Sequence, residues 1–290
     1  MNQSTVNSMT SNKALTYCFF GAGSQAEAIV RGMLKQSITA PSQIQMINRS
    51  NQERLAELRQ RYEIQADNDI DTKRRWLSEA DIIILAMKPK DVREACHELR
   101  SLLRKDCLVV SVIAGLSIES LQRMLGTIAV VRTMPNTSST IGLGATGVSY
   151  SSEVTAEQRE IAINLLQAIG IVAEVEEVSI DAITGVSGSG PAYVYYLMEA
   201  MIEAGIQEGL EPEQAHDLVV QTVRGAAEMV RLTGESPAEL RRKVCSPGGA
   251  TLAALTIMDQ NGVGEAVKSA VHRARTRAAE MGEEIGREIH

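Results

Sequence analysis

Short, unbroken apolar runs that alternate with helix-like segments constrain the fold of this chain more than any other feature. Ile82–Leu85 and Leu108–Val110 are continuous rather than alternating, as expected of parallel strands that are buried on both faces. Strands of this kind are connected by helices that pack on both faces of the sheet. We therefore predict a doubly wound, mostly parallel α/β domain.

This alternating pattern covers only part of the chain. The predicted strands are Leu15–Phe20, Gln45–Ile47, Asp81–Ala86, Leu108–Val112, Ala129–Arg132 and Ile171–Val175. The predicted helices between them include Gln25–Lys35, Gln52–Tyr62 and Ala156–Ile169. After Glu177 the pattern is helical throughout, in Pro191–Gly209, Glu213–Leu232, Pro237–Lys243 and Gly264–Ile289. We predict a flexible tail over residues 1–13, the α/β domain over 14–177 and an all-helical domain over 178–290.

Composition excludes several classes of protein. The 290 residues are 44% hydrophobic and 22% charged, with a net charge of -7, which is typical of a globular protein and argues against nucleic-acid binding. No apolar run reaches the roughly 18 residues that a membrane span requires. The N-terminal residues lack the pattern of a secretory signal, and four widely spaced cysteines favour free thiols over disulfides or metal ligands. We predict a cytoplasmic protein with no metal site.

A glycine-rich loop follows the first predicted strand and opens a helix. Its sequence is Gly21-Ala22-Gly23-Ser24-Gln25-Ala26. The first glycine allows a tight turn, the second lets the backbone approach a pyrophosphate, and Ala26 lets the helix pack closely on the strand. At the first strand–helix junction of an α/β domain, this loop is the dinucleotide fingerprint of a Rossmann domain.

The end of the second predicted strand bears on the choice of cofactor. NAD enzymes usually carry an acidic residue there for the ribose hydroxyl, whereas this chain has Asn48-Arg49-Ser50. An arginine binds a 2′-phosphate through charge-assisted hydrogen bonds, which favours NADPH, with NADH as the weaker alternative. The other interpretation of Arg49 is a solvated side chain at a polar strand end. Lys88, at a later strand end, is either a ribose contact or a surface charge.

Two glycine-rich helix starts stand out in the helical half. In Ser246–Thr251 we predict that Ser246 caps a helix, that Pro247 is its first residue, and that two glycines expose backbone N–H groups to a small anion. An ordinary helix start is the alternative. Ser187–Pro191 is either the wall of a pocket or a site of tight helix packing. The many small apolar residues of this half indicate burial against another subunit.

Together with Arg132–Thr137 and Asp181–Tyr193, these segments resemble the pyrroline-5-carboxylate reductase family from about Tyr17 to Arg277. The resemblance implies a Rossmann domain plus a helical dimerisation domain, with an active site formed between two subunits. It also implies NADPH-dependent reduction of 1-pyrroline-5-carboxylate to L-proline, the last step of proline biosynthesis. The sequence departs from the family at Ser24-Gln25, where Asn-Met is common, and at Lys243, where a smaller polar residue is frequent.

The resemblance also implies roles for individual residues. The cofactor residues would be Gly21, Ala22, Gly23, Ser24, Gln25, Ala26, Asn48, Arg49, Ser50, Asn68, Ala86, Met87, Lys88, Pro89, Val112, Ile113 and Ala114. The substrate residues would be Glu177, Ser246, Gly248, Gly249, Ala250 and Thr251. Thr251 is the expected catalytic residue, because its hydroxyl can bind the ring nitrogen or the carboxylate of the substrate.

A protonated cyclic imine is already a good electrophile, so the protein needs mainly to position it near the hydride. No histidine–carboxylate pair marks a general acid, and His97, His216, His272 and His290, which lie on charged helical stretches, are expected to be solvated. Trp76 is expected to be half-exposed.

Two other functions compete with imine reduction. A β-hydroxyacid dehydrogenase of the same plan relies on a lysine in its helical domain, and here only Lys243 and Lys268 are available, neither in a glycine-rich setting. A non-catalytic NADP-binding regulator is expected to lose the Ser246–Thr251 turn, which this chain retains.

Overall fold

The computed structural model describes residues 14–289, so the predicted tail and His290 lie outside the described residues. The chain divides into two compact units. The first extends to Ile183 and includes the chain again from Ala278, and the second comprises Thr184–Arg277. This return to the first unit was not predicted from the sequence, and the boundary after residue 177 stays a prediction.

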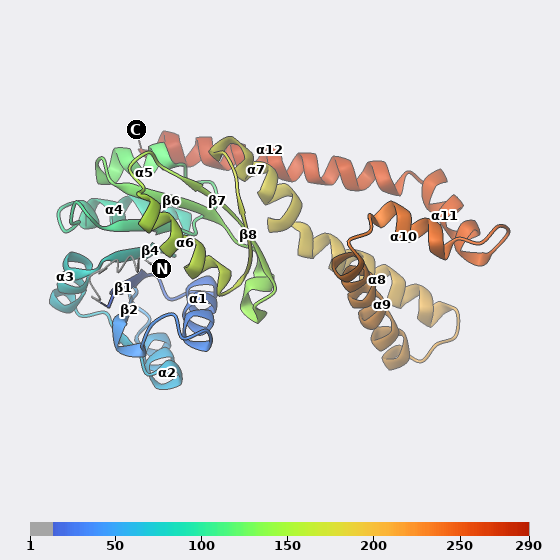
Figure 1. Cartoon of the computed structure of the whole chain (residues 1–290), viewed down its shortest axis with the longest axis horizontal. Coiled ribbons are helices and arrows are strands. Elements are labelled where there is room, and N and C mark those ends of the chain that lie inside the picture. Colours follow the sequence, from blue (N-terminus) through green and yellow to red (C-terminus); the bar gives the residue numbers. More distant parts are fainter. Residues whose placement is uncertain (1–13, 290) are drawn as a thin grey trace, which may run out of the picture. The chain divides into compact units, whose positions relative to one another are not determined.

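An eight-stranded sheet forms the centre of the first unit. Its strands are β1 Tyr17–Phe20, β2 Ile44–Ile47, β3 Gln65–Asp67, β4 Ile82–Leu85, β5 Leu108–Ser111, β6 Ala129–Met134, β7 Gly144–Tyr150 and β8 Gly170–Glu174. Their order is β3-β2-β1-β4-β5-β6-β7-β8, and every neighbouring pair is parallel except β6 and β7 (Figure 1). The predicted doubly wound, mostly parallel sheet is confirmed.

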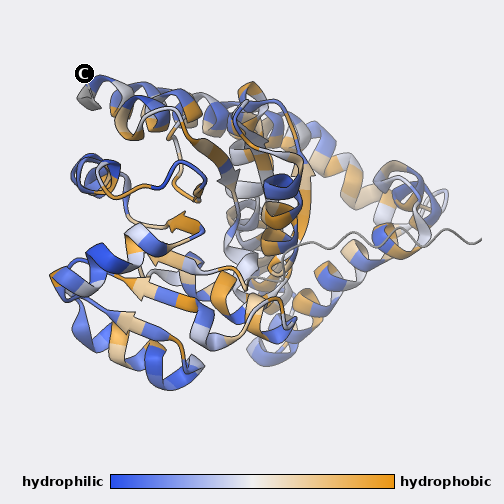
Figure 2. Cartoon of the chain, turned by 60° about the vertical axis from the view of Figure 1, so that its left-hand side comes forward, coloured by the Kyte–Doolittle hydropathy of each residue, from blue (hydrophilic) through white to orange (hydrophobic). Residues whose placement is uncertain are grey.

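Helices cover both faces of this sheet. They are α1 Ser24–Lys35, α2 Gln52–Tyr62, α3 Ile70–Glu79, α4 Val92–Arg100, α5 Ile118–Leu125 and α6 Ala156–Gln167. Successive strand side chains point to opposite faces, so Tyr17 and Phe19 join a first core with α1, α2 and α6, and Cys18 and Phe20 a second core with α3, α4 and α5. Figure 2 shows the apolar strands between helices that carry both polar and apolar residues.

Three features of this unit differ from the sequence prediction or were not predicted. β3 is a three-residue edge strand in which only Ala66 is apolar, and β7 lacks an apolar run because it contains Gly144 and Gly147. A Cβ at Gly147 would lie 2.4 Å from the Ile183 side chain, so packing requires the small residue there. The prediction of a half-exposed Trp76 is wrong, because α3 turns this side chain into the second core, where it is 6% exposed.

The second unit is helical, as predicted. After α7 Ile180–Ile183 in the first unit and a π-helical turn at Thr184–Gly188, the chain forms α8 Gly190–Gln207, α9 Pro212–Thr233, α10 Pro237–Val244, α11 Ala250–Gln260 and α12 Val263–Ile289. The last of these helices begins in the second unit and continues into the first. No described helix is long and apolar enough to cross a membrane.

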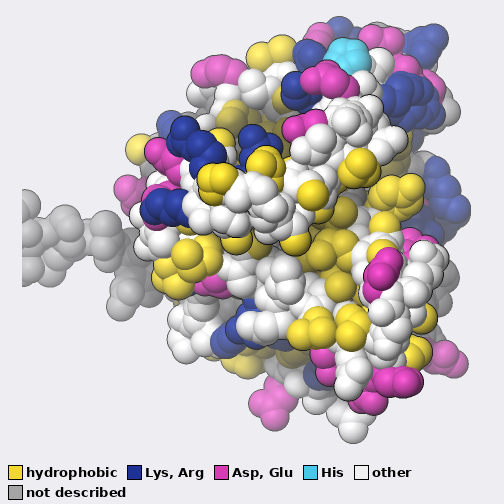
Figure 3. All heavy atoms as spheres, turned by 90° about the vertical axis from the view of Figure 1, so that its right-hand side faces the viewer, with side chains coloured by type: hydrophobic (Ala, Val, Ile, Leu, Met, Phe, Trp, Pro, Cys, Tyr) yellow, Lys and Arg dark blue, Asp and Glu magenta, His cyan; other side chains and the backbone are white. Residues whose placement is uncertain are grey.

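The second unit has very little core of its own. Its buried apolar side chains are those of Ala215 and Val219, whereas Tyr196, Leu218 and Leu232 are 76%, 57% and 69% exposed. Figure 3 shows many hydrophobic side chains at the surface of the face that carries these helices. An apolar surface of this kind marks a protein–protein interaction site.

Candidate cofactor and substrate site

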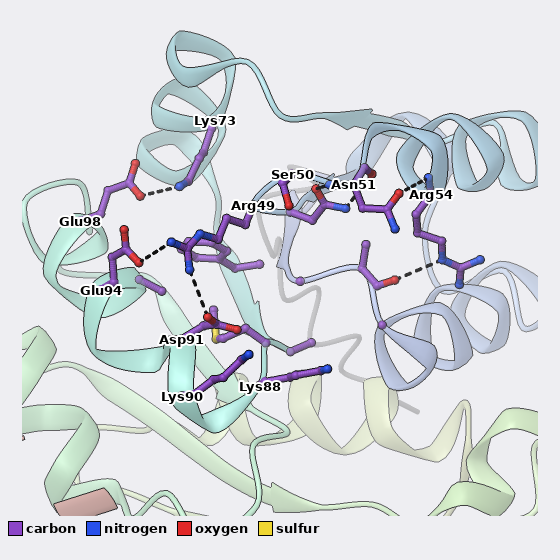
Figure 4. Close-up of a pocket in the computed structure, with 18 residues that line it drawn as sticks. Arg49, Ser50, Asn51, Arg54, Lys73, Lys88, Lys90, Asp91, Glu94 and Glu98 are labelled. Carbon is purple, nitrogen blue, oxygen red and sulfur yellow. Dashed lines mark hydrogen bonds and ion pairs between the residues drawn. The ribbon is translucent and has the colours of Figure 1, made fainter. Parts of the chain in front are cut away.

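A pocket of about 660 Å³ lies where β1, β2 and β4 end (Figure 4). The chain continues from β1 to β2 on one side of the sheet, while β4 lies on the other side of β1. Ligands of open α/β sheets bind at such a switch point. The pocket is lined by Phe20, Gly21, Ala22, Gly23, Asn48, Arg49, Ser50, Asn51, Arg54, Lys73, Ala86, Met87, Lys88, Lys90, Asp91, Glu94, Ala95 and Glu98.

The fingerprint glycines form the floor of this pocket. Gly21 has φ of +120°, and a Cβ there would lie 2.4 Å from the carbonyl oxygen of Ala86, so no other residue fits this close approach. Gly23 is the N-cap of α1, and no side chain caps that helix. The first N–H groups of α1 are therefore open to an anionic ligand. Ala26 is fully buried in the first core.

Several predicted cofactor residues do not line the pocket. These are Ser24, Gln25, Ala26, Asn68, Pro89, Val112, Ile113 and Ala114. Gln25 instead donates from Nε2 to the carbonyl oxygen of Asn136 at 3.1 Å, and Asn68 accepts a hydrogen bond from Gln52 at 3.1 Å. The Ile113 side chain is 3% exposed and packs in the second core. The cofactor role of these residues stays a prediction.

Arg49 extends into a charged part of the pocket. Its guanidinium lies 3.3 Å from Asp91 Oδ1 and 3.4 Å from Glu94 Oε2, and the side chain is 72% exposed. Ion pairs as exposed as these stabilise a protein by only about 0–1 kcal/mol. The guanidinium is therefore available to a ligand with a stronger negative charge.

The other cations of the pocket differ in how firmly they are held. Arg54 pairs with Glu27 and Glu57 and donates from Nε to the carbonyl oxygen of Ala22 at 3.3 Å. Lys88 and Lys90 are exposed, and no ion pair joins either of them to another described residue (Figure 4). The pocket thus offers positive charge to phosphate groups.

Sequence reasoning missed the pocket residues that come from helices. Glu94 and Glu98 of α4 line the pocket together with Asp91, the N-cap of that helix, and Lys73 from α3 pairs with Glu98. Their spacing of three, four and seven residues is the only signal in the sequence, since it places them on one helix face.

Glu177 is engaged within the first unit. Its Oε1 accepts a hydrogen bond from the Ile118 N–H at 2.7 Å and another from Arg132 at 3.1 Å. Arg132 also bonds to Asp181 at 3.1 Å, and its side chain is only 8% exposed. Burying a guanidinium requires partners of opposite charge, which these two carboxylates supply. A substrate contact by Glu177 stays a prediction.

The predicted helix start at Ser246 is wrong. Gly248 has φ of +71°, in the left-handed region, so a helix does not run through it. Gly249 donates to the carbonyl oxygen of Ser246 at 3.0 Å, which closes a turn, and α11 begins at Ala250 with Gly249 as its N-cap. No side chain caps α11, just as none caps α1. The exposed backbone that we predicted for this segment therefore lies at the start of α11, and its ligand stays a prediction.

The histidines and lysines of the other hypotheses are on the surface, where His216 Nδ1 lies 3.0 Å from Oδ1 of its exposed neighbour Asp217. His97, His216 and His272 are exposed on α4, α9 and α12. Lys243 pairs with Glu235, and Lys268 pairs with Glu265 at 2.7 Å. All four cysteines are free, namely Cys18, Cys96, Cys107 and Cys245. Burial raises the pKa of the Cys96 thiol to about 12, which makes it unreactive.

Comparison with known domain families agrees with both units. Residues 177–281 match the family described as pyrroline-5-carboxylate reductase dimerisation. Residues 16–115 match the family described as NADP oxidoreductase coenzyme F420-dependent. The first match covers the helical part of the chain, and the second covers the strands that form the pocket.

Individual relatives match over nearly the whole chain. Pyrroline-5-carboxylate reductase 2 of Bacillus subtilis (strain 168) is 43% identical over 92% of this chain and 95% of that protein. A pyrroline-5-carboxylate reductase structure from Coxiella burnetii superposes with a TM-score of 0.86, at 34% identity over 93% of this chain and 99% of that chain. The Plasmodium falciparum pyrroline carboxylate reductase with NADP bound gives 0.82, at 27% identity over 92% of this chain and 98% of that chain. This chain belongs to the pyrroline-5-carboxylate reductase family.

Proposed function

We propose that this protein reduces 1-pyrroline-5-carboxylate to L-proline with NADPH, the last step of proline biosynthesis. The observation that carries this proposal is the family match across both units, 43% identical to a named reductase over 92% of the chain. NADH is the weaker alternative cofactor. We also propose a cytoplasmic location, which the four free thiols support.

The pocket at the ends of β1, β2 and β4 fits a phosphorylated dinucleotide. A Cβ at Gly21 would fill the space against Ala86, and the uncapped start of α1 offers N–H groups to a pyrophosphate. Arg49 and Lys88 supply positive charge for the 2′-phosphate and the ribose. When bound, NADPH supplies the hydride. The protein holds it through Gly21–Ala26, Asn48–Ser50 and Ala86–Pro89, together with Asn68 and Val112–Ala114.

The turn before α11 is the proposed substrate site. The uncapped helix start at Gly249, Ala250 and Thr251 binds the substrate carboxylate, with Ser246 and Gly248 shaping the turn. Thr251 is the proposed catalytic residue, and its hydroxyl binds the ring nitrogen or the carboxylate. The imine already carries its activating proton, so the protein contributes mainly orientation and exclusion of water. Glu177 is proposed to act near this site.

The working form is proposed to be a homo-oligomer, at least a dimer, in which each active site uses residues from two chains. The dimerisation family match over 177–281 and the exposed apolar helices of the second unit support this arrangement. A β-hydroxyacid dehydrogenase function finds no support, because the two lysines that it could use, Lys243 and Lys268, are exposed on α10 and α12 and neither lies in a glycine-rich setting.

The test is the oxidation of NADPH by the purified protein with racemic pyrroline-5-carboxylate, beside NADP reduction with a panel of β-hydroxyacids. We expect turnover with the imine alone and proline as the product. Turnover with a β-hydroxyacid would contradict the proposal. Binding of NADPH without turnover of either substrate would instead identify a non-catalytic regulator.

A further inference from the structure

Contacts with other elements hold the loop between β5 and α5, residues 112–117, at its start, at its end and in its middle. At its start, the hydroxyl of Thr133 donates to the carbonyl oxygen of Ser111 at 2.9 Å. At its end, the N–H of Ile118 donates to Glu177 at 2.7 Å. In its middle, Gly115 meets Gly282 of α12. A loop fixed at both ends and in the middle has little freedom to move.

The contact between Gly115 and Gly282 is a close approach of two backbones. A Cβ at Gly282 would lie 2.9 Å from the carbonyl oxygen of Gly115, closer than such atoms can come. Gly115 has φ of +77°, and a Cβ there would lie 3.4 Å from the backbone nitrogen of Gly282. Ile285, one turn further along α12, packs against the second core. Glycine at position 282 thus lets α12 pack directly against the loop.

Two of the three contacts come from the segments that flank the helical unit. The chain enters that unit at Thr184, shortly after Glu177, and leaves it at Arg277, shortly before Gly282. Glu177 is itself fixed by Arg132, whose side chain is 8% exposed. The two connections of the helical unit therefore hold the same loop of the α/β unit.

We propose that Gly282 and Glu177 are positioning residues that set the β5–α5 loop for NADPH binding. This inference rests on the proposed function in one respect, that Val112, Ile113 and Ala114 border the cofactor. The side chain of Ile113 is buried in the second core. The contacts described above therefore position the backbone of this residue. A displaced loop weakens NADPH binding without any change in a residue that touches the cofactor.

The first test is the dissociation constant of NADPH for Gly282→Ala, measured by calorimetry without substrate. We expect affinity to fall about tenfold, because a small misplacement of a binding group carries a large penalty. Gly286→Ala is the matched control, since a Cβ on this glycine of the same helix meets nothing within 4 Å. Gly286→Ala should bind NADPH as the wild type does. Equal affinities for all three proteins would overturn the proposal.

A second pair of variants separates positioning from stability. Gly32→Ala also forces a Cβ against a backbone carbonyl, at 2.4 Å from the oxygen of Ala168, on α1 rather than on α12. It should lower the melting temperature and leave the NADPH affinity of the folded protein unchanged. A Gly32→Ala protein that loses NADPH affinity as Gly282→Ala does would refute the positioning role.

Glu177→Ala keeps the inference testable if Gly282→Ala does not fold. A positioning role predicts weaker NADPH binding in the absence of substrate, whereas a substrate contact alone predicts a higher KM for the imine and unchanged NADPH affinity. The second outcome would contradict the proposal for Glu177. Because NADPH binding is measured without the imine, a wrong substrate assignment would leave these results interpretable.

Discussion

We expect Arg49 to determine the preference for NADPH over NADH. Its exposed pairs with Asp91 and Glu94 are weak, so a 2′-phosphate with charge-assisted hydrogen bonds displaces them. Arg49→Asp removes this attraction and adds a third carboxylate. The ratio of kcat/KM for NADPH to that for NADH should fall about ten- to hundredfold, as expected for losing a hydrogen bond to a charged group. Arg49→Gln, which adds no charge, should shift the ratio less, and an unchanged ratio in Arg49→Asp would show that Arg49 does not bind the phosphate.

We expect substitutions in the turn before α11 to impair imine reduction. A Cβ at Gly249 would lie 2.4 Å from Ser246 Oγ, so Gly249→Val both distorts the turn and blocks the N–H groups of α11. Imine reduction should be nearly abolished while NADPH affinity stays normal. Thr251→Ala should reduce kcat/KM by a factor equivalent to about 1–3 kcal/mol, the penalty for one unmade polar contact. Circular dichroism checks that both variants fold, and normal turnover by folded Gly249→Val would exclude the turn as the substrate site.

Among the elements, α1 and α2 are joined by a charged cluster. Glu27 on α1 bonds to Arg54, to Arg61 at 2.8 Å and to Tyr62 at 2.8 Å. Burial by itself raises the pKa of Glu27, but the hydrogen bonds from Arg54 and Tyr62 outweigh it, so the pKa lies below its usual value. Stability from this cluster is therefore complete above about pH 4.3, the unfolded value, and is lost as the pH falls through the lower folded value.

Glu27→Gln tests this linkage. At pH 7 it should lower the free energy of unfolding by about 2 kcal/mol, since the lost hydrogen bonds are to charged groups. The difference from the wild type should shrink as the carboxylate of the wild type becomes protonated below about pH 4. Urea unfolding at several pH values measures both proteins. A difference that does not change with pH would contradict the ionic role of Glu27.

Most elements could be predicted from the sequence, and those that were missed share a cause. β4 and β5 are buried on both faces, so their apolar runs are unbroken and recognisable. β7 has a glycine, Gly147, where it packs on Ile183, and β3 at the edge of the sheet has Ala66 as its single apolar residue, so neither strand has that pattern. The start of α11 was misplaced because Pro247 fits a first helical turn, whereas the φ of Gly248 is set by the turn as a whole.

For the pocket, the sequence predicted the residues that follow strands and missed those on helices. Residues after parallel strands collect at one edge whatever the details of packing, which is why Gly21, Asn48 and Ala86 were foreseeable. Glu94 and Lys73 enter the pocket only because of how α3 and α4 are rotated on the sheet. That rotation depends on how the second core packs, so it cannot be predicted from a local sequence pattern.

At the scale of the whole molecule, the exposed apolar side chains of the second unit indicate that two or more chains associate. Its helices bury few of their own apolar side chains. The exposure of apolar side chains such as Tyr196 and Leu232 to water is unfavourable unless a partner surface covers them. Light scattering should give a mass of at least two chains, and activity per chain should fall on dilution below the dissociation constant of the dimer. A monomer with full activity at nanomolar concentration would exclude a site shared between two chains.

The return of the chain to the first unit at Ala278 also sets the order of folding during synthesis. Domains generally fold from the N-terminus as the ribosome makes them. Here Ile285 packs against the second core of the α/β unit, yet the whole of Thr184–Arg277 is translated before it. A nascent chain therefore carries a nearly complete Rossmann unit with an unfilled apolar surface throughout the synthesis of the helical unit. We expect that interval to be the period in which this protein most depends on chaperones.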